Sequence, residues 1–291
     1  MYSQIDSNKR KTILLIAIFV VFITSLGWVF GKMYNFGYYG LAIAIVISIS
    51  MSLFSYYEGD KVALWTAGAK PIKKQENPYV YNMVENLAIT AGLPLPKIHI
   101  IQDQAINAFA CGRDPKHASI AITSGAIKKL ENEELEGVIA HELSHIKDYD
   151  IRLMTIVIIL VGIIALMSDW MIKGQLFGLG GRDKEKNNVL IIIGIVLAIL
   201  SPLAAKLIQL SISRKREFLA DANGALLTRY PEGLARALEK IAQENIPLKR
   251  ANNATSHLYI SNPFKGSKNK ISKMFSTHPP IQERIKALKN M

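Results

Sequence analysis

The chain has 291 residues, of which 50% are hydrophobic, and a formal net charge of +12 at pH 7. No basic stretch is interleaved with stacking aromatic residues, so we do not expect a nucleic-acid-binding protein. The single cysteine, Cys111, excludes an internal disulfide and favours a reducing compartment for the polar part of the chain.

Four uncharged runs predict hydrophobic helices, at residues 12–30, 36–57, 153–168 and 189–205. A bilayer core about 30 Å thick requires about 20 helical residues. The first two runs meet this length, so residues 12–57 are expected to form two transmembrane helices. The last two are slightly short, so residues 153–210 are expected to form a hydrophobic hairpin that spans with help from flanking residues or dips into the bilayer. The first run lacks a signal-peptide cleavage pattern, so we interpret it as a retained helix.

Basic clusters predict the orientation of these helices. Lys9–Lys11 and Arg214–Arg216 lie beside apolar runs, as is typical of the cytoplasmic side, where anionic lipid head groups attract them. Residues 1–11 are therefore expected to form a short cytoplasmic tail. An even number of hydrophobic helices then places residues 58–152 and 211–291 in the cytoplasm as well.

The polar region 58–152 alternates helix and strand signals. Asn77 followed by proline predicts a helix start, and Gly92 predicts its end. Alternating or β-branched residues predict three short strands, at Lys97–Ile101, Asn107–Cys111 and Ser119–Thr123. An exposed edge of such a sheet can pair with an extended peptide. The alternative is an ordinary sheet edge without a binding role.

The stretch Ala140–His145 contains the motif His-Glu-x-x-His in a helical pattern. Asn132 is the predicted N-cap, and the helix is expected to continue through Asp150 towards the third apolar run. His141 and His145 are four positions apart, so both imidazoles lie on one helical face and can bind one zinc ion. Glu142 is placed to act on a water at that ion. The alternative is a chance coincidence of two helical histidines.

A catalytic zinc usually has three protein ligands and one open position. The other histidines lie at no spacing that identifies a third ligand; they are His99, His117, His257 and His278. Glu217 and Asp221 are four positions apart and share a helical face. Glu217 can bind zinc while Asp221 accepts a hydrogen bond from a ligand imidazole. The alternative is two solvated acids on a surface helix.

Residues 231–243 and 280–289 predict two further helices, separated by a long loop over residues 251–276.

The two motifs, each beside a hydrophobic hairpin, resemble the HtpX type of membrane zinc metalloprotease, a gluzincin with HExxH and ExxxD motifs. Asn107-Ala108-Phe109-Ala110 is similar to the segment that precedes the zinc helix in that family. Asp150 matches an aspartate downstream of the motif, and Ser276–Pro280 resembles a Thr-His-Pro signature. The resemblance runs from near the N-terminus to the last helix.

The resemblance implies a mainly α, α+β fold with four hydrophobic helices and a cytoplasmic zincin-type metallopeptidase domain that contains a small β-sheet. It implies a multi-pass protein of the bacterial inner membrane with both termini in the cytoplasm. The expected activity is that of a zinc metalloendopeptidase with one zinc per chain, which acts on misfolded or damaged membrane proteins in stress response and quality control. His141, His145 and Glu217 are then the ligands, and Glu142 is the general base.

Other residues are expected to have supporting roles. Asp221 is expected to hold a ligand histidine in the correct tautomer, whereas Asp150 either supports that helix or a histidine or is an inert helical acid. His278 either donates to the oxyanion, occupies the open metal position, or is structural. Asn107 to Ala110 form the expected substrate-pairing edge.

The alternative function is a membrane-anchored metal-binding scaffold without protease activity. The intact Glu142 argues against it, because a purely structural site does not require that carboxylate. A channel or transporter is disfavoured because the four apolar runs lack charged residues near the bilayer midplane.

Overall fold

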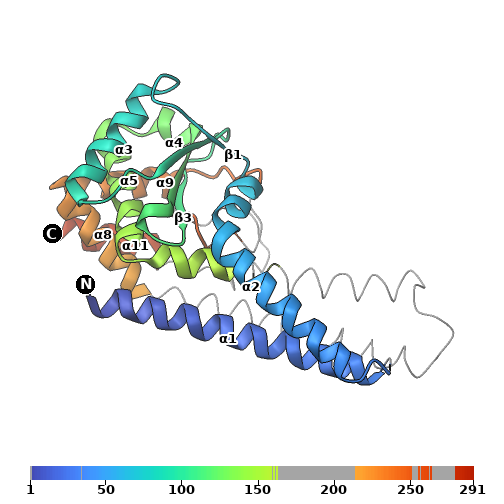
Figure 1. The fold of residues 1–291 in the computed structure, drawn as a ribbon. Coiled ribbons are helices and arrows are strands. Elements are labelled where there is room, and N and C mark those ends of the chain that lie inside the picture. The colour runs from blue at the N-terminus through green and yellow to red at the C-terminus, as the bar shows by residue number, and fades with distance from the viewer. Residues whose placement is uncertain are drawn as a thin grey trace.

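The computed structural model of the chain describes residues 2–33, 35–158, 160, 162, 214–250, 255, 257–261, 263 and 279–291 (Figure 1). The predicted hairpin at 153–210 lies mostly outside these residues, and His278 lies wholly outside them. The described helices are α1 (Tyr2–Met33), α2 (Tyr38–Ala67), α3 (Pro78–Ala91), α4 (Ser124–Lys129), α5 (Asn132–Lys147), α8 (Arg214–Thr228), α9 (Pro231–Gln243) and α11 (Ile281–Lys289). The strands are β1 (Ala69–Pro71), β2 (Lys97–Ile101), β3 (Ala108–Gly112) and β4 (Ala118–Thr123), with a short 3-10 helix at Pro115–His117.

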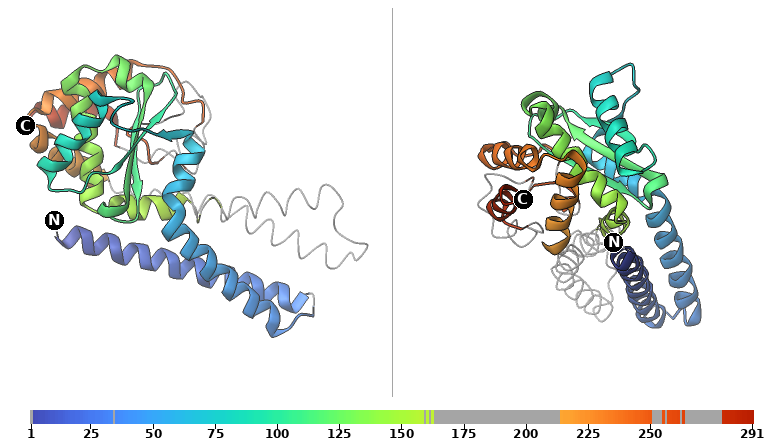
Figure 2. Two further views of the ribbon diagram at one scale, coloured as in Figure 1. Left: turned by 45° about the horizontal axis from the view of Figure 1, so that its top comes forward. Right: turned by 90° about the vertical axis from the view of Figure 1, so that its left-hand side faces the viewer.

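Helices α1 and α2 form a long hairpin that projects from the rest of the molecule (Figures 1 and 2). Among the described residues, Ile5–Val29 and Tyr38–Ala67 are long and apolar enough to cross a membrane. Many of their large apolar side chains face outwards; examples are Ile13, Leu14, Val21, Ile43 and Val46. Outward apolar residues on both helices fit a lipid environment rather than water.

Small residues allow the two helices to approach closely. Gly27 and Gly31 of α1 lie against Gly40 and Ala44 of α2, and a Cβ added to Gly40 would lie 2.6 Å from the Gly31 Cα. Such close backbone contact is typical of paired membrane helices, where van der Waals packing rather than the hydrophobic effect holds the helices together.

Both ends of the hairpin differ from the sequence-based expectation. The sequence predicts a polar tail up to residue 11, but residues 2–11 are part of helix α1; Asn8 in this stretch is buried, and so is Thr12 directly after it. Helix α2 continues to Ala67, past the predicted end at residue 57, because its last turns pack into the domain core through Ala63, Leu64 and Ala67. Tertiary contact therefore extends both helices beyond their apolar runs.

The sheet has the strand order β1-β2-β4-β3. Strands β2 and β4 are parallel, and β1 and β3 are antiparallel to their neighbours, so the sheet is mixed. The prediction at Lys97–Ile101 is confirmed, whereas β3 begins one residue later and β4 one residue earlier than expected. Strand β1 was not predicted, because its three residues gain strand geometry only by pairing with β2.

Apolar side chains bury both faces of this sheet. On one face, Ile98, Ile120 and Ile122 belong to a core cluster that includes residues of helices α3, α5 and α9. On the other face, the end of α2 and residues 154–158 pack on Phe109 and Cys111. Burial on both faces explains why β3 and β4 show continuous rather than alternating burial.

The helix of the His-Glu-x-x-His motif differs from its prediction at both ends. It begins at Asn132 rather than after it, and Glu131 is the N-cap, whose backbone N–H donates to the Glu134 carboxylate at 2.8 Å. The helix also ends at Lys147 instead of continuing through Asp150. Tyr149 has a φ of 60°, which breaks the helix before helical geometry resumes at Asp150.

Candidate metal centre

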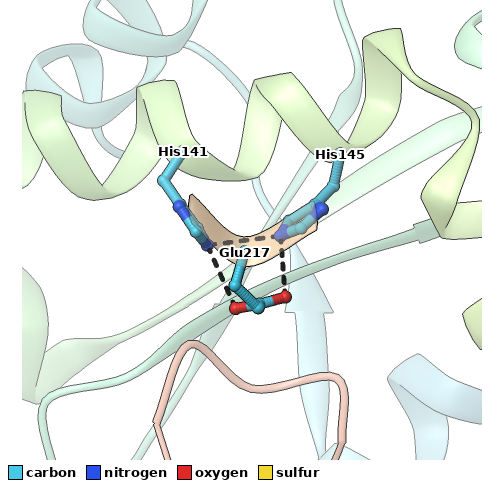
Figure 3. A group of neighbouring side chains, drawn as sticks. All are labelled: His141, His145 and Glu217. Atoms are coloured by element: carbon cyan, nitrogen blue, oxygen red, sulfur yellow. Dashed lines mark hydrogen bonds and ion pairs between the residues drawn. The ribbon is translucent and has the colours of Figure 1, made fainter. Parts of the chain in front are cut away.

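Helix α5 presents the two motif histidines on one buried face. The Nε2 atoms of His141 and His145 lie 3.2 Å apart, with the imidazole rings edge to face (Figure 3). Their spacing of four residues produces this arrangement, because side chains at i and i+4 stack along one side of a helix. Both side chains are almost completely removed from solvent.

Glu217 completes the group from helix α8. Its carboxylate oxygens lie 4.0 Å from the Nε2 of His141 and 3.7 Å from the Nε2 of His145 (Figure 3). Helix α8 approaches α5 at Gly224, where an added Cβ would lie only 3.1 Å from the His141 backbone nitrogen. A residue without a side chain at this crossing lets α8 come close enough for Glu217 to face the histidines.

These separations match a tetrahedral metal site. Zinc–nitrogen and zinc–oxygen distances of about 2.0–2.1 Å place two ligand atoms of a tetrahedral zinc about 3.4 Å apart. The observed separations between ligand atoms, 3.2, 3.7 and 4.0 Å, lie near this value. Small side-chain movements would therefore bring all three ligand atoms to bonding distance from one metal ion. Among the described residues, His141, His145 and Glu217 are the group that offers ligand atoms within 4.8 Å of one another.

A carboxylate holds the far nitrogen of each imidazole. The Nδ1 of His141 lies 2.9 Å from Asp221 Oδ1, and the Nδ1 of His145 lies 3.0 Å from Asp150 Oδ2. Each Nδ1 therefore donates to a carboxylate, so in the neutral form of each imidazole the Nε2 lone pair is directed at the candidate metal position. The break in the helix at Tyr149 brings Asp150 back towards His145.

Arg284 of helix α11 is a buried part of the site that sequence reasoning missed. Its Nε and Nη2 donate to the Asp221 carboxylate at 2.8 and 2.7 Å, and its Nη1 donates to the Ile260 carbonyl at 3.0 Å. The side chain is 1% exposed. A basic amphipathic helix favours solvent-exposed arginines, and no local pattern indicates that Arg284 contacts Asp221.

The buried charges shift the pKa values of the site in opposite directions. Burial lowers the pKa of His141 to about 4, although the Asp221 hydrogen bond acts against this. Burial also acts to lower the pKa of His145, but the Asp150 hydrogen bond and the Glu217 charge outweigh it and raise this pKa to about 9. Burial tends to raise the pKa of Asp221, but the Arg284 charge holds it at about 2.

Glu142 lies beside the ligand group on the same helix and is 2% exposed. Burial and, to a smaller degree, the Glu217 charge raise the pKa of Glu142 to about 7, and the backbone N–H of Ala110 donates to its carboxylate. A carboxylate with a pKa near neutrality can both accept and return a proton at physiological pH, which is the requirement for a general acid–base group.

The predicted substrate-binding stretch forms the edge strand β3, and the chain itself covers this edge. The Ile260 N–H donates to the Ala108 carbonyl at 3.1 Å, and the Asn107 amide donates to the Ser261 carbonyl at 3.4 Å. Phe109 is fully buried, with its ring edge to face against Tyr259 at a centroid distance of 5.2 Å. The residues of this edge are therefore in internal contact.

The site and its setting define a class of protein. A pair of helical histidines with a glutamate between them, a carboxylate from a second helix as the candidate third ligand, and a small adjoining sheet are the parts of a metallopeptidase. Residues 74–291 match the model of Peptidase_M48, peptidase family M48. The chain belongs to this family and is a membrane metallopeptidase.

Curated relatives extend over the whole chain. A protein named "Protease HtpX homolog" from Dictyoglomus thermophilum is 43% identical over 290 residues, covering 100% of this chain and 94% of the relative. Proteins of the same name from Caldanaerobacter subterraneus subsp. tengcongensis and Lactobacillus helveticus are 42% and 40% identical and also cover 100% of this chain, with 98% and 100% of their own lengths matched. These relatives confirm the HtpX-type resemblance of the motifs.

The fold also resembles a solved structure. The crystal structure of S. mikatae Ste24p matches with a TM-score of 0.50 and 19% identity, covering 99% of this chain and 67% of that chain. At this identity the likeness concerns the fold alone.

Proposed function

We propose that this protein is a zinc-dependent endopeptidase that hydrolyses peptide bonds of misfolded or damaged membrane proteins in a stress response. The observation that carries the proposal is the convergence of His141, His145 and Glu217 on one point, with Glu142 next to them. Two imidazoles, which bind zinc in their neutral form, and a carboxylate are ligands that zinc accepts.

The reaction follows from the placement of the side chains. When bound, zinc supplies a water with a pKa lowered to about 7 and polarises the scissile carbonyl. Glu142 accepts the proton of the attacking water and then delivers it to the leaving amine. Its pKa of about 7 suits both steps. Asp221 and Asp150 keep the ligand imidazoles in the tautomer that presents Nε2 to the metal.

Asn107 to Ala110 are our proposed substrate-pairing edge. An extended peptide that adds to the outer side of β3 would pass close to Glu142, because the Ala110 N–H already points to that carboxylate. Residues 258–261 must first move away from this edge, because the Ile260 N–H already donates a hydrogen bond to the Ala108 carbonyl. In this proposal the self-contact competes with the substrate.

His278 is our proposed further contributor, from its position between Thr277 and Pro279 in the sequence. In this hypothesis its imidazole donates to the oxyanion of the transition state.

We propose the bacterial inner membrane as the location, with the catalytic domain and both termini in the cytoplasm. The N-terminal end of α1 supports a shared side, because Asn8 contacts Asp148 and Asp150 of the domain. The end of α2 enters the same domain, so both helix ends distant from the 34–37 connection meet it (Figure 1). The basic cluster Lys9–Lys11 favours the cytoplasm for this side.

The test uses the full chain purified in detergent. We expect one zinc per chain by metal analysis and hydrolysis of casein that a chelator abolishes. Glu142→Gln should retain zinc and lose activity by about 10²-fold or more, because it removes the general base but no ligand. Bound zinc with equal hydrolysis by both proteins would instead support the membrane-anchored scaffold.

The substrate class needs a second comparison. A membrane protein carrying a destabilising mutation should be cleaved faster than its folded parent when both are reconstituted with the enzyme in liposomes. Equal cleavage of the two forms would contradict a quality-control role and leave the peptidase assignment intact.

A further inference from the structure

Asn8 is buried where the N-terminal helix α1 meets the domain. In the sequence it is far from the motifs at 141–145 and 217–221. It is 3% exposed. Its side-chain amide donates to Asp150 Oδ1 at 2.7 Å and to the Asp148 carbonyl at 3.0 Å. Its side-chain oxygen accepts from Arg216 Nη1 at 3.0 Å. One amide thus contacts three groups around the metal centre.

These contacts form a closed ring of three side chains. Arg216 Nη1 also donates to Asp150 Oδ1, at 2.8 Å, so this oxygen accepts from both Asn8 and Arg216. The second oxygen, Oδ2, is left to accept from the Nδ1 of His145 at 3.0 Å. The hydrogen bonds among Asn8, Arg216 and Asp150 therefore fix the rotation of the Asp150 carboxylate. This carboxylate in turn fixes the plane of the His145 imidazole.

The position suits an asparagine in particular. The amide provides two N–H donors and an acceptor oxygen in one plane, and the structure uses both functions at once. A leucine has nearly the same size but provides neither. An aspartate would keep the acceptor for Arg216, but it would lose both donors and place a second carboxylate against Asp150.

A second contact docks the same stretch of α1. The Lys9 ammonium lies 5.2 Å from the ring centroid of Tyr149, the residue whose positive φ breaks helix α5. Asn8 and Lys9 together cover the turn that directs Asp150 back to His145. On the other side of the ring, Arg216 precedes the third candidate ligand, Glu217, on α8.

We propose that Asn8 is a positioning residue of the metal centre, through which docking of the first membrane helix orients the ligand His145. The inference rests on the proposed zinc site and deepens it. The first helix is then more than an anchor, because zinc affinity depends on its contact with the Asp148–Asp150 turn. Loss of that contact should loosen the site even though all three ligands remain.

The experiment compares Asn8→Leu and Asn8→Asp with the wild-type full chain in detergent. Zinc affinity is measured by competition with a chromogenic chelator, and ligand geometry by the visible absorption of the Co(II)-substituted protein. We expect both variants to bind zinc about 10-fold more weakly and to show an altered Co(II) spectrum, as is typical when a partner of a ligand histidine is lost. Asn8→Asp keeps the size and polarity of the site should Asn8→Leu fold poorly.

Thr12→Val is the matched control. Thr12 is buried on the same face of α1, and its hydroxyl donates only within the helix, to the Asn8 carbonyl at 2.9 Å. It should keep wild-type zinc affinity and Co(II) spectrum. In addition, Asn8→Leu should have no further effect in an Asp150→Asn background, because Asn8 acts through that carboxylate.

The outcomes separate this inference from the proposed function. If the wild type binds one zinc and both Asn8 variants match its zinc affinity and Co(II) spectrum, the inference is overturned. This holds even if the variants unfold at a lower temperature, because Asn8 would then contribute to stability and not to the metal centre. If wild type binds no zinc, the proposed function fails and the inference falls with it. Additive effects of Asn8→Leu and Asp150→Asn would also overturn a role through Asp150.

Discussion

Replacement of Arg284 by methionine tests the buried ion pair behind the metal centre. Arg284 is 1% exposed, and two of its nitrogens donate to Asp221 at 2.8 and 2.7 Å. Methionine fills much of the same volume but leaves the Asp221 carboxylate buried without its cation. Removing one partner of a buried pair destabilises a protein by about 3–5 kcal/mol, because an uncompensated charge remains in the interior.

The metal site should respond together with stability. Without Arg284, burial dominates and the pKa of Asp221 rises from its value of about 2. Asp221 then holds the Nδ1 of His141 less firmly, and we expect zinc affinity to fall about 10- to 100-fold. Thermal unfolding followed by circular dichroism and chelator competition measure the two effects.

Two variants make this test specific. Arg236→Met removes an exposed arginine of helix α9 and should change stability by less than about 1 kcal/mol. The double variant Arg284→Met, Asp221→Asn removes both charges and should unfold at a higher temperature than Arg284→Met alone. If Arg284→Met were as stable as Arg236→Met, the ion pair would not support the site in the way described.

Three further predictions concern protons, the strand edge and His278. The pKa of His145 is raised to about 9, and an imidazole must be neutral to bind zinc, so zinc binding near pH 7.5 should release a proton. Zinc affinity should then rise roughly tenfold per pH unit up to that pKa. Calorimetry in two buffers measures the number of protons released, and a value of zero would contradict this prediction. Ala108→Pro should lower kcat/KM without loss of zinc. Ile260→Pro removes the N–H that donates to the Ala108 carbonyl and should therefore lower KM. Equal peptide cleavage by both variants and the wild type would refute competition between residues 258–261 and substrate at β3. His278→Ala should lower kcat about 10²-fold at unchanged zinc content, and wild-type turnover would exclude a role in the reaction.

Local patterns were sufficient for much of the fold. The asparagine–proline pair at 77–78 and Gly92 delimited helix α3, because capping is a property of adjacent residues: the Asn77 side chain accepts from the Val80 N–H, and Gly92 has a φ of 68°. Strand β2 was predicted from its own alternation. Strand β1 and the continuation of α2 to Ala67 were not predictable in this way, because partners distant in sequence stabilise them.

The sequence alone determined the geometry of the first half of the candidate metal centre. His141 and His145 meet because a helix repeats every 3.6 residues, so four positions of spacing set their geometry before any tertiary contact forms. Tertiary structure decided the rest. The Glu217 approach depends on a helix crossing at Gly224, Arg284 lies 63 positions from the Asp221 that it binds, and Asn8 lies 142 positions from Asp150. No local pattern predicts these contacts, because the two partners are distant in sequence. Packing buries both partners, and a buried polar group is costly unless it forms a hydrogen bond, so the contact forms only in the folded chain.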